Sequence, residues 1–344
     1  MSDRSPMTQG ATAKKPRQPG FFGQLLRDWI TLRKPVPNWE AFLLSVLFIV
    51  LSFSGWWFVT RGEPEERMIG PITLPSPQET FARLPELFHE PFDIVANTLM
   101  TLRRVSTGFL LAVTIGVPLG VLAGCFPRFN SFLAPAVMFG RNIPLAAVLP
   151  LLLFIVSGGD QRQVIFIFIA CVAFIISDTA RAVIDVEGRY VDTAYTLGAS
   201  RWQTIIKVLV PLAMPTIFGS FRVLFGLAFG YIMLAESQRN PDDVGGLGFQ
   251  IQMFQRRGLR EHIVLVILII PLVAVVVDQI LYWVQRQLFP HVYGGAGWLE
   301  KGIRLVLLGW DDVKHWFFRY DPPGHIALPQ PVSEAQTSTE STKP

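Results

Sequence analysis

The chain has 344 residues, of which 51% are hydrophobic and 16% are charged, and its mean hydropathy is +0.40. Soluble domains carry roughly 25% charged residues, so this composition excludes an ordinary soluble domain and predicts a protein that crosses a membrane several times. The formal net charge of +4 is common in such proteins because their cytoplasmic loops collect Lys and Arg, and it predicts no nucleic-acid partner.

Six apolar stretches are long enough to cross a bilayer core of about 30 Å, which takes about 20 residues of helix. In chain order they cover approximately residues 41–59, 99–124, 134–156, 163–182, 211–235 and 262–286. The last five contain many Gly and Pro residues, which are more frequent in membrane helices than in soluble ones, and small residues let helices pack closely. The sequence therefore predicts an all-α membrane bundle of about six transmembrane helices.

The segments around these stretches are distinguished by composition. No A-x-A cleavage pattern follows residues 41–59, which predicts a retained first span rather than a removed signal peptide. Residues 298–320 mix Trp, Phe and Leu with charges, as in an amphipathic helix on a membrane surface or in a disordered or packing segment, and residues 322–344 are typical of a disordered tail. We predict a cytoplasmic N-terminal segment (1–40), a first transmembrane helix (41–59), an extracytoplasmic linker (60–98), a permease core in the membrane (99–290) and a cytoplasmic C-terminal segment (291–344).

The distribution of charged loops bears on orientation. Arg27, Arg33 and Lys34 precede the first span, which favours a cytoplasmic N-terminus, and six spans then place the C-terminus in the cytoplasm too. A loop that this topology places outside contains three arginines between residues 256 and 260, so charge bias alone leaves the orientation open. The predicted location is the plasma (inner) membrane, with several passes and both termini cytoplasmic.

Between the fourth and fifth stretches lies the half-polar segment "YVDTAYTLGASRWQTIIKVLVPLAMP" (190–215). Apolar or small residues recur there at steps of three and four, which predicts one face of a cytoplasmic helix over about 190–210. Gly198 costs roughly 1 kcal/mol in a helix interior, and this indicates a bend or the close approach of another surface. The helix either offers a docking surface or lies flat on lipid.

The same segment resembles the cytoplasmic signature of ABC-transporter permeases: E-A-A, three residues, G, nine residues, I, one residue, L-P. The residues at these positions are Asp192-Thr193-Ala194, Gly198, Val208 and Val210-Pro211. Four of them depart from the signature: Asp replaces Glu, Thr replaces Ala, and Val replaces both Ile and Leu. Further stretches resemble the nitrate/sulfonate/taurine/bicarbonate importer group, and together they cover about residues 74–290. They are "LPSP" (74–77), "TLRRVSTGFLLAVTIGVPLGVLAG" (101–124), "RNIPLAAVLPLLLFIVSGG" (141–159), "LGASRWQTIIKVLVPLAMPTIFGSFRVLFG" (197–226), "GGLGFQI" (245–251) and "VVVDQILYWVQRQL" (275–288).

The resemblance implies a type I importer permease fold in which the cytoplasmic segment is a coupling helix. It implies two separate ATP-binding subunits, which bind ATP and Mg, and an extracytoplasmic solute-binding protein. It also implies a second permease copy, so a homodimer is expected, with a heterodimer as the alternative. The residues implied in coupling are Asp192, Ala194, Tyr195, Leu197, Gly198, Ala199, Arg201 and Trp202. An outer-loop turn is implied at Gly245, Gly246 and Gly248.

Motifs for independent chemistry are absent from the sequence. It contains no G-x-x-x-x-G-K-[ST] phosphate loop, so ATP hydrolysis by that route requires another subunit. "GGLGFQ" lacks the third Gly of a dinucleotide loop and predicts a tight turn. Cys125 and Cys171 lie in apolar stretches and the five histidines are scattered, so no disulfide framework, metal site or catalytic residue is predicted.

Charged residues within the apolar stretches cost roughly 2.5–3.5 kcal/mol each at mid-membrane, so each needs a partner, an interfacial position or a function. Glu236 and Asp278 are predicted chiefly to pair or to lie at the interface. The candidate path residues are Arg141, Asn142, Ser177, Asp178 and Arg222. The two arginines among them would make a path tolerable to a small anion.

Two other classes of transport protein are compatible with an apolar helical chain. A self-sufficient secondary transporter or channel commonly carries inverted repeats, and none is visible here at the level of motifs. An exporter is disfavoured because the outer-loop motif and the separate ATPase belong to the importer pattern. The leading hypothesis is therefore the membrane subunit of an ATP-driven importer for a small anionic solute.

Overall fold

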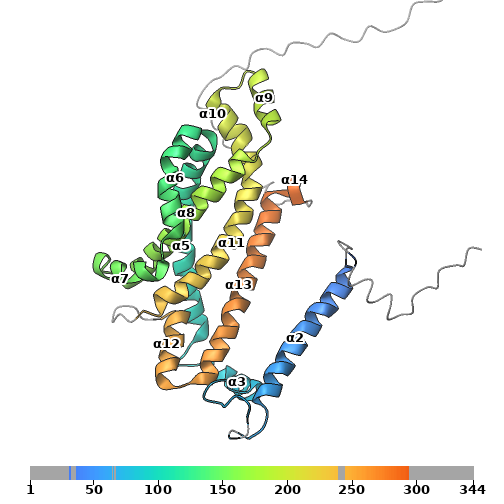
Figure 1. Ribbon diagram of the computed structural model, residues 1–344, viewed down its shortest axis with the longest axis vertical. Coiled ribbons are helices and arrows are strands. Elements are labelled where there is room, and N and C mark those ends of the chain that lie inside the picture. Colours follow the sequence, from blue (N-terminus) through green and yellow to red (C-terminus); the bar gives the residue numbers. More distant parts are fainter. Residues whose placement is uncertain (1–30, 32–35, 64, 66, 239–244, 294–344) are drawn as a thin grey trace, which may run out of the picture. The chain divides into compact units, whose positions relative to one another are not determined.

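The computed structural model describes residues 31, 36–63, 65, 67–238 and 245–293, and within these ranges the regular secondary structure is entirely helical (Figure 1). The predicted amphipathic stretch and C-terminal tail, and nearly all of the N-terminal segment, lie outside the described residues. The elements are α2 (Asn38–Thr60), α3 (Pro77–Ala82), α4 (Leu84–Leu87), α5 (Ile94–Cys125), α6 (Pro127–Asn142), α7 (Leu145–Ile155), α8 (Gly159–Ile184), α9 (Gly188–Thr196), α10 (Arg201–Thr204), the π-helix η1 (Ile205–Leu209), α11 (Val210–Glu236), α12 (Leu247–Arg257), α13 (Arg260–Leu288) and α14 (Pro290–Tyr293).

Five of the described helical segments are long and apolar enough to cross a membrane. They are α2, α5, α8, the continuous segment Arg201–Glu236 and α13, and a bent pair formed by α6 and α7 makes a sixth if it is one crossing. The predicted all-α bundle of about six transmembrane helices is thereby confirmed.

The third predicted span, residues 134–156, is not one straight helix. It comprises most of α6 and all of α7, whose axes meet at 97°. Pro144 causes the break, because a proline ring disfavours helical backbone at the preceding residue and removes an amide donor. Ile143 is extended accordingly, with φ −61° and ψ 127°. The apolar stretch predicted the helical residues but not the break between the two helices.

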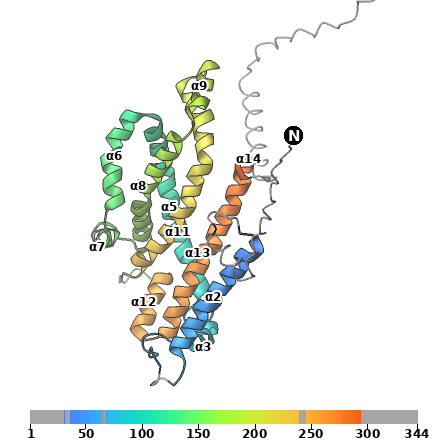
Figure 2. The ribbon, with the colours of Figure 1, turned by 45° about the vertical axis from the view of Figure 1, so that its right-hand side comes forward.

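The centre of the bundle is the packing of α5 against α8. Four glycines of α5 lie so close to α8 that an added β-carbon would come within 3 Å of an α8 atom: Gly108, Gly116, Gly120 and Gly124. Gly108, near the start of α5, lies against the Val164 carbonyl of α8, and Gly124, at its end, lies against the Ala180 carbonyl. The two helices therefore run in the same direction. The chain must therefore return between them through α6 and α7, which favours a single crossing by that pair (Figure 2).

One of these glycines gives a testable packing prediction. A β-carbon at Gly120 would lie 2.6 Å from the Thr179 β-carbon and 2.8 Å from the Ile176 carbonyl oxygen. We expect Gly120→Ala to lower the free energy of unfolding by about 1–3 kcal/mol, since overpacking forces the backbones apart. The control is Gly226→Ala in α11, where the added carbon meets open space. Thermal unfolding in detergent measures both, and equal melting temperatures would contradict the packing account.

Contacts divide the described chain into two compact units, residues up to Leu84 with Arg260–Val264, and Pro85–Leu259 with the residues from Leu265. In the first unit α3 begins at a capping box: Glu79 N donates to Ser76 Oγ, and Ser76 N donates to the Glu79 carboxylate at 2.8 Å. The same carboxylate accepts two hydrogen bonds from Arg67, at 2.9 and 3.1 Å. These bonds fix the loop after α2.

This ion pair predicts an acid-sensitive loop. The hydrogen bonds from the Arg67 guanidinium lower the pKa of Glu79 to about 2. A carboxyl whose folded-state pKa is lowered contributes stability above its unfolded pKa, which is about 4.3, and loses it as the pH falls toward 2. We expect Glu79→Gln to remove a small part of the stability difference between pH 6 and pH 3, since Glu79 is 40% exposed and solvent screens the pair. Glu65→Gln in the same exposed loop is the control, and identical pH profiles for the two variants would contradict the prediction.

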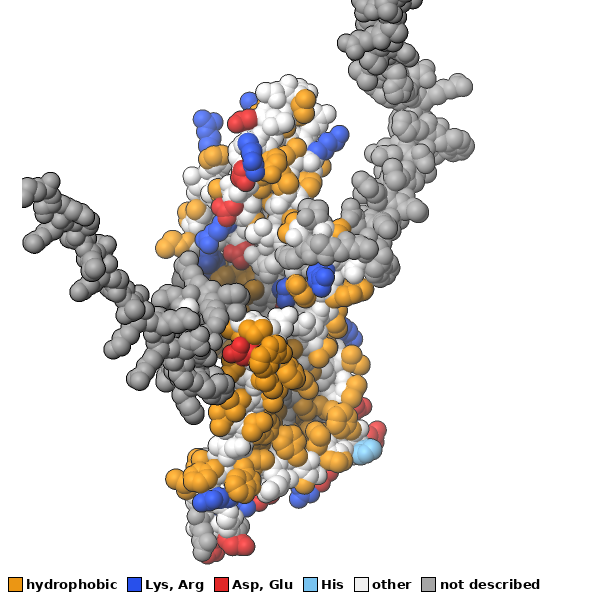
Figure 3. Space-filling model, turned by 90° about the vertical axis from the view of Figure 1, so that its right-hand side faces the viewer, with side chains coloured by type: hydrophobic (Ala, Val, Ile, Leu, Met, Phe, Trp, Pro, Cys, Tyr) orange, Lys and Arg blue, Asp and Glu red, His pale blue; other side chains and the backbone are white. Residues whose placement is uncertain are grey.

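The apolar surfaces of two helices show how the chain meets lipid. In α2 only Thr60 is buried, and large side chains such as Phe48 and Leu51 are 72% and 61% exposed. In α13 exposed residues include Leu272 at 63% and Val275 at 56%. Figure 3 shows many hydrophobic side chains of the described residues at the surface, with charged side chains among and beyond them. Such surfaces are stable in a bilayer and not in water.

Candidate functional site

The segment after α8 folds as two short helices joined at a glycine. Gly198 adopts φ +80°, a left-handed conformation that glycine enters without a steric penalty. Its N–H donates to the Tyr195 carbonyl at 3.0 Å, and Ala199 N donates to the Ala194 carbonyl at 3.0 Å. These two bonds form a Schellman motif, which ends α9 by satisfying its last carbonyl groups.

The next helix, α10, begins at Arg201, three residues after Gly198. Ser200 caps α10 in a capping box: Gln203 N donates to Ser200 Oγ, and Ser200 N donates to Gln203 Oε1 at 2.8 Å. The prediction of one helix over 190–210 is therefore wrong in detail, because a helix stop and a helix start adjoin within residues 197–200. The bend expected at Gly198 is confirmed.

The projecting α9–α10 turn exposes apolar side chains. Leu197 is 82% exposed, Trp202 61% and Tyr195 51%, while Ala194 is only 7% exposed and packs inward. Asp192, Gly198 and Arg201 are also exposed, and Ala199 is half-buried. Of the predicted coupling residues, Ala194 therefore supports the turn from beneath, and the others remain candidates for contact with a partner.

One aromatic contact joins this turn to the rest of the bundle. The Trp202 ring meets the Phe126 ring edge-on, with centroids 6.3 Å apart. Phe126 is the single residue between α5 and α6. A displacement of α10 would therefore act directly on the junction of these two helices. Sequence reasoning did not identify Phe126, since it is 76 residues away from its partner.

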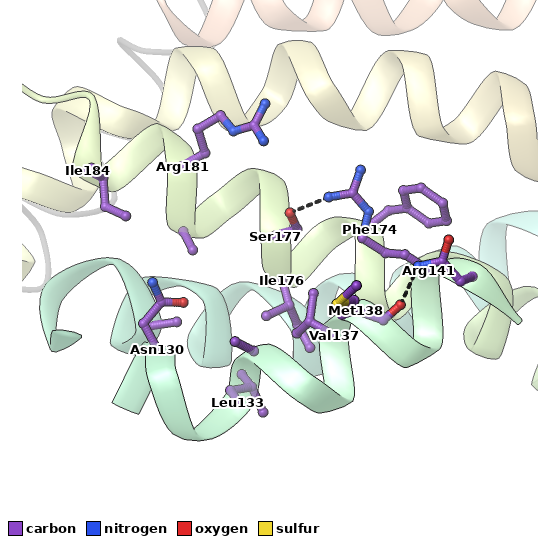
Figure 4. Close-up of a pocket in the computed structure, with 14 residues that line it drawn as sticks. Asn130, Leu133, Val137, Met138, Arg141, Phe174, Ile176, Ser177, Arg181 and Ile184 are labelled. Carbon is purple, nitrogen blue, oxygen red and sulfur yellow. Dashed lines mark hydrogen bonds between the residues drawn. The ribbon is translucent and has the colours of Figure 1, made fainter. Parts of the chain in front are cut away.

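A cavity of about 540 Å³ lies between α6 and α8. Three of the predicted path residues line it: Arg141, Asn142 and Ser177. Arg141 donates to Ser177 Oγ at 2.8 Å, and its guanidinium lies 5.1 Å from the centre of the Phe174 ring (Figure 4). Asp178 and Arg222 do not line this cavity. Asn130 and Arg181, which the sequence did not single out, do.

Arg222 is held by an ion pair between α11 and α13. Its guanidinium donates to both carboxylate oxygens of Asp278, at 3.0 and 2.7 Å, and to Gln285 Oε1 at 3.2 Å. It also lies 4.7 Å from the centre of the Tyr282 ring. The pairing predicted for Asp278 is therefore confirmed, and for Arg222 it is one of the two roles that the sequence left open. The pair joins α13 to α11.

A second charged network lies where α11 ends and α8 begins. The Arg104 side chain is 2% exposed and donates to Glu236, which is fully buried, at 3.0 Å. Arg104 also pairs with Asp160 at 2.6 Å, and the exposed Arg103 pairs with the same carboxylate. The pairing predicted for Glu236 is confirmed: its cationic partner is Arg104 of α5, which also pairs with Asp160 of α8.

The glycine-rich turn before α12 closes over this network. Gly245 and Gly246 have φ +88° and +102°, so the predicted tight turn is present. The Gly246 and Gly248 N–H groups donate to Asn97 Oδ1 at 2.7 Å and to Glu236 Oε2 at 3.0 Å. A β-carbon at Gly246 would lie 2.4 Å from the Glu236 carboxyl carbon. Glycine is needed here because the carboxylate approaches the backbone.

Together these features define a membrane-spanning transport subunit. Its helices expose apolar faces, an apolar turn projects from the bundle, and arginines line a cavity between two of the helices. The chain belongs to the family described as binding-protein-dependent transport system inner membrane component, whose model matches residues 116–291, just over half of the chain. It is the permease subunit of an ABC importer, as the sequence motifs predicted.

Similar proteins include two permeases of Synechococcus elongatus. The bicarbonate transport system permease protein CmpB is 28% identical over 80% of this chain and 97% of its own length. The nitrate import permease protein NrtB is 25% identical over 74% of this chain and 92% of its own length. Among solved structures, the inward-facing MetNI methionine ABC transporter aligns with a TM-score of 0.50 at 20% identity, over 59% of this chain and 99% of that chain. This likeness supports the fold.

Proposed function

We propose that this permease carries a small anionic solute into the cytoplasm and that the α9–α10 turn couples it to separate ATP-hydrolysing subunits. The observation that carries the proposal is the turn itself. Its Schellman motif and capping box fix Leu197 and Trp202 outward, so that two large apolar side chains project at a helix junction. Exposed apolar groups held rigidly in this way are typical of a docking surface.

In this proposal ATP and Mg are bound by the partner subunits and the permease holds no cofactor. Two ATP-binding subunits would each receive one α9–α10 turn, and their closure on ATP would displace the turn. The Trp202–Phe126 contact would pass that displacement to the α5–α6 junction. Because α6 carries Arg141 and Asn142, the movement would reach the cavity between α6 and α8.

The proposed solute class rests on the similar permeases and on charge. CmpB and NrtB are named for bicarbonate and nitrate, which are small oxyanions. Arginines that line the cavity would offset the cost of placing such an anion in a medium of low dielectric constant. Bicarbonate, nitrate and sulfonates such as taurine are the candidates to test.

The proposed assembly contains two permease copies, most simply as a homodimer, with an extracytoplasmic solute-binding protein on the opposite side from the ATPases. Both termini and the α9–α10 turn would face the cytoplasm, and the Gly245–Gly248 turn would face outward. In this arrangement the ATP-binding subunits dock on the cytoplasmic face and the solute-binding protein docks on the outer face.

Orientation is tested with single cysteines in a chain whose Cys125 and Cys171 are replaced by alanine. Both target positions, Gln203 and Gln255, are exposed. An impermeant thiol reagent is expected to label Gln203→Cys only from the cytoplasmic side and Gln255→Cys only from outside. The reverse pattern would overturn the proposed topology and with it the role of the turn.

Transport is tested in proteoliposomes that hold the permease with its ATP-binding subunits and binding protein. We expect uptake of labelled bicarbonate, nitrate or taurine that requires ATP. Uptake that continues without ATP or the partner subunits would instead support a self-sufficient secondary transporter or channel.

A further inference from the structure

The cavity between α6 and α8 contains cations without counter-charges. Two arginines line it, Arg141 from α6 and Arg181 from α8, and none of the described residues that line it is Asp or Glu. Figure 4 shows Arg141 reaching across to Ser177, with Arg181 one helical turn further along α8. Two guanidinium groups and a hydroxyl therefore lie at one cavity.

These arginines differ from Arg104 and Arg222, the two arginines that hold other helices of the bundle together. Arg104 and Arg222 each pair with carboxylates at 3.0 Å or less. Within the described part of the chain, Arg141 and Arg181 form no ion pair, and the one hydrogen bond of Arg141 goes to a neutral hydroxyl. A guanidinium is always charged and its planar fork matches the geometry of an oxyanion. A cavity with two such groups and no carboxylate has the chemistry of an anion site.

The position of the cavity along α8 adds a second observation. Ser177 and Arg181 lie about 27 and 33 Å along the helix from Gly159, at 1.5 Å per residue, and so near the end that leads to α9. A second cavity of about 510 Å³ adjoins the first, and Ala123, Asn130 and Ile184 line both. Tyr195 and Arg201 of the α9–α10 turn line the second cavity. The arginine-lined cavity is therefore next to the proposed coupling element.

We propose that Arg141, Ser177 and Arg181 form an oxyanion-binding site that holds the charged group of the solute at the cytoplasmic end of its path. The proposal deepens the proposed function and rests on it. The incoming oxyanion accepts hydrogen bonds from both guanidinium groups, and Arg141 exchanges its neutral acceptor at Ser177 for a charged one. Charge-assisted bonds of this kind are about twice as strong as neutral ones. Since the second cavity adjoins this site, the anion is bound where movement of the coupling turn can release it.

Occupancy can be measured by protection of a cysteine in the site. In the assembled complex in lipid, Cys125 and Cys171 are replaced by alanine and Met138→Cys is introduced. Met138 lines the cavity and is 71% exposed. An anionic methanethiosulfonate reagent is the probe. Sodium nitrate, sodium bicarbonate and taurine, a zwitterion that carries a sulfonate group, are the protecting solutes, each tested separately at an ionic strength kept equal with sodium chloride.

We expect at least one of the three solutes to slow modification. Arg181→Gln and Arg141→Gln should each raise the concentration for half-protection about tenfold or more, since a hydrogen bond to a charged group contributes on that order. Arg128→Gln is the matched control, because Arg128 is on α6 but does not line the cavity. It should leave protection unchanged.

Failure of the site and failure of the proposed function give different results. If none of the three solutes protects Met138→Cys, or if protection survives both Arg141→Gln and Arg181→Gln, the site is wrong even in a complex that transports with ATP. If protection depends on both arginines while uptake proves independent of ATP, the site is supported and the coupling role of the α9–α10 turn is wrong.

Discussion

Arg104→Gln is expected to lower the free energy of unfolding by about 3–5 kcal/mol, because it leaves a fully buried carboxylate without its cationic partner. Glu236 would then retain only the Thr101 hydroxyl, at 2.9 Å, and the Gly248 amide, at 3.0 Å. Two hydrogen bonds from neutral donors offset only part of the cost of a buried charge. The turn that closes over Glu236 would loosen with it, since Arg104 also donates to the Gly245 carbonyl at 2.9 Å.

The neighbouring arginine supplies the control for this prediction. Arg103 pairs with Asp160 as Arg104 does, but its side chain is 66% exposed, and exposed pairs contribute about 0–1 kcal/mol. Arg103→Gln should therefore change the melting temperature little. The two variants differ by one position and remove the same charge, so only burial separates them. Equal melting temperatures in lipid or detergent would show that the Arg104–Glu236 pair does not hold α5 to α11.

If Arg104→Gln yields no folded protein, Glu236→Gln, which removes the buried charge, should rescue part of the yield in the double variant.

The features predicted correctly from the sequence are those encoded by neighbouring residues. Each predicted apolar stretch overlaps one of the candidate spans among the described residues, since about 20 residues of helix match one bilayer, although the segment Arg201–Glu236 begins ten residues before the predicted 211–235. Gly198 indicated a bend because no other residue enters a left-handed conformation so readily. The sequence also contains the Ser-x-x-Gln pattern of a capping box at Ser200–Gln203. It was not used as a prediction, but it indicates the helix start that divides α9 from α10.

The features that the sequence did not reveal depend on residues far apart in the chain. Arg104 meets Glu236 across 132 residues, and Asp160 across 56. No local pattern distinguishes a buried partner such as Arg104 from an exposed neighbour such as Arg103. For the same reason the sequence could not distinguish the two arginines predicted to line the path. In the structure Arg141 lines the cavity, whereas Arg222 pairs with Asp278. Only the packing of helices decides which charges are neutralised.

Gly198→Leu is expected to weaken docking of the ATP-binding subunit about tenfold and to abolish substrate-stimulated ATP hydrolysis, while insertion of the permease in the membrane persists. At φ +80° a leucine is strained by roughly 1–2 kcal/mol, so the Schellman motif opens and Leu197 and Trp202 leave their positions. About 1.4 kcal/mol corresponds to a factor of ten in binding. An added β-carbon at Gly198 meets no atom within 4 Å, so the effect would arise from backbone conformation and not from a clash within the bundle.

Two further variants separate backbone strain from the loss of a small residue. Gly198→Asn should retain most of the coupling, because asparagine tolerates the left-handed conformation and replaces glycine at helix ends. Gly188→Leu should also retain it, since Gly188 begins α9, lacks a positive φ and faces open space. Docking is measured by co-purification of the ATP-binding subunit, and coupling by ATP hydrolysis with and without the loaded binding protein. If Gly198→Leu hydrolyses and transports like the unmodified chain, the α9–α10 turn is not the coupling element. If Gly198→Asn fails as severely as Gly198→Leu, the partner approaches the Gly198 backbone itself, and close contact rather than the bend makes glycine necessary.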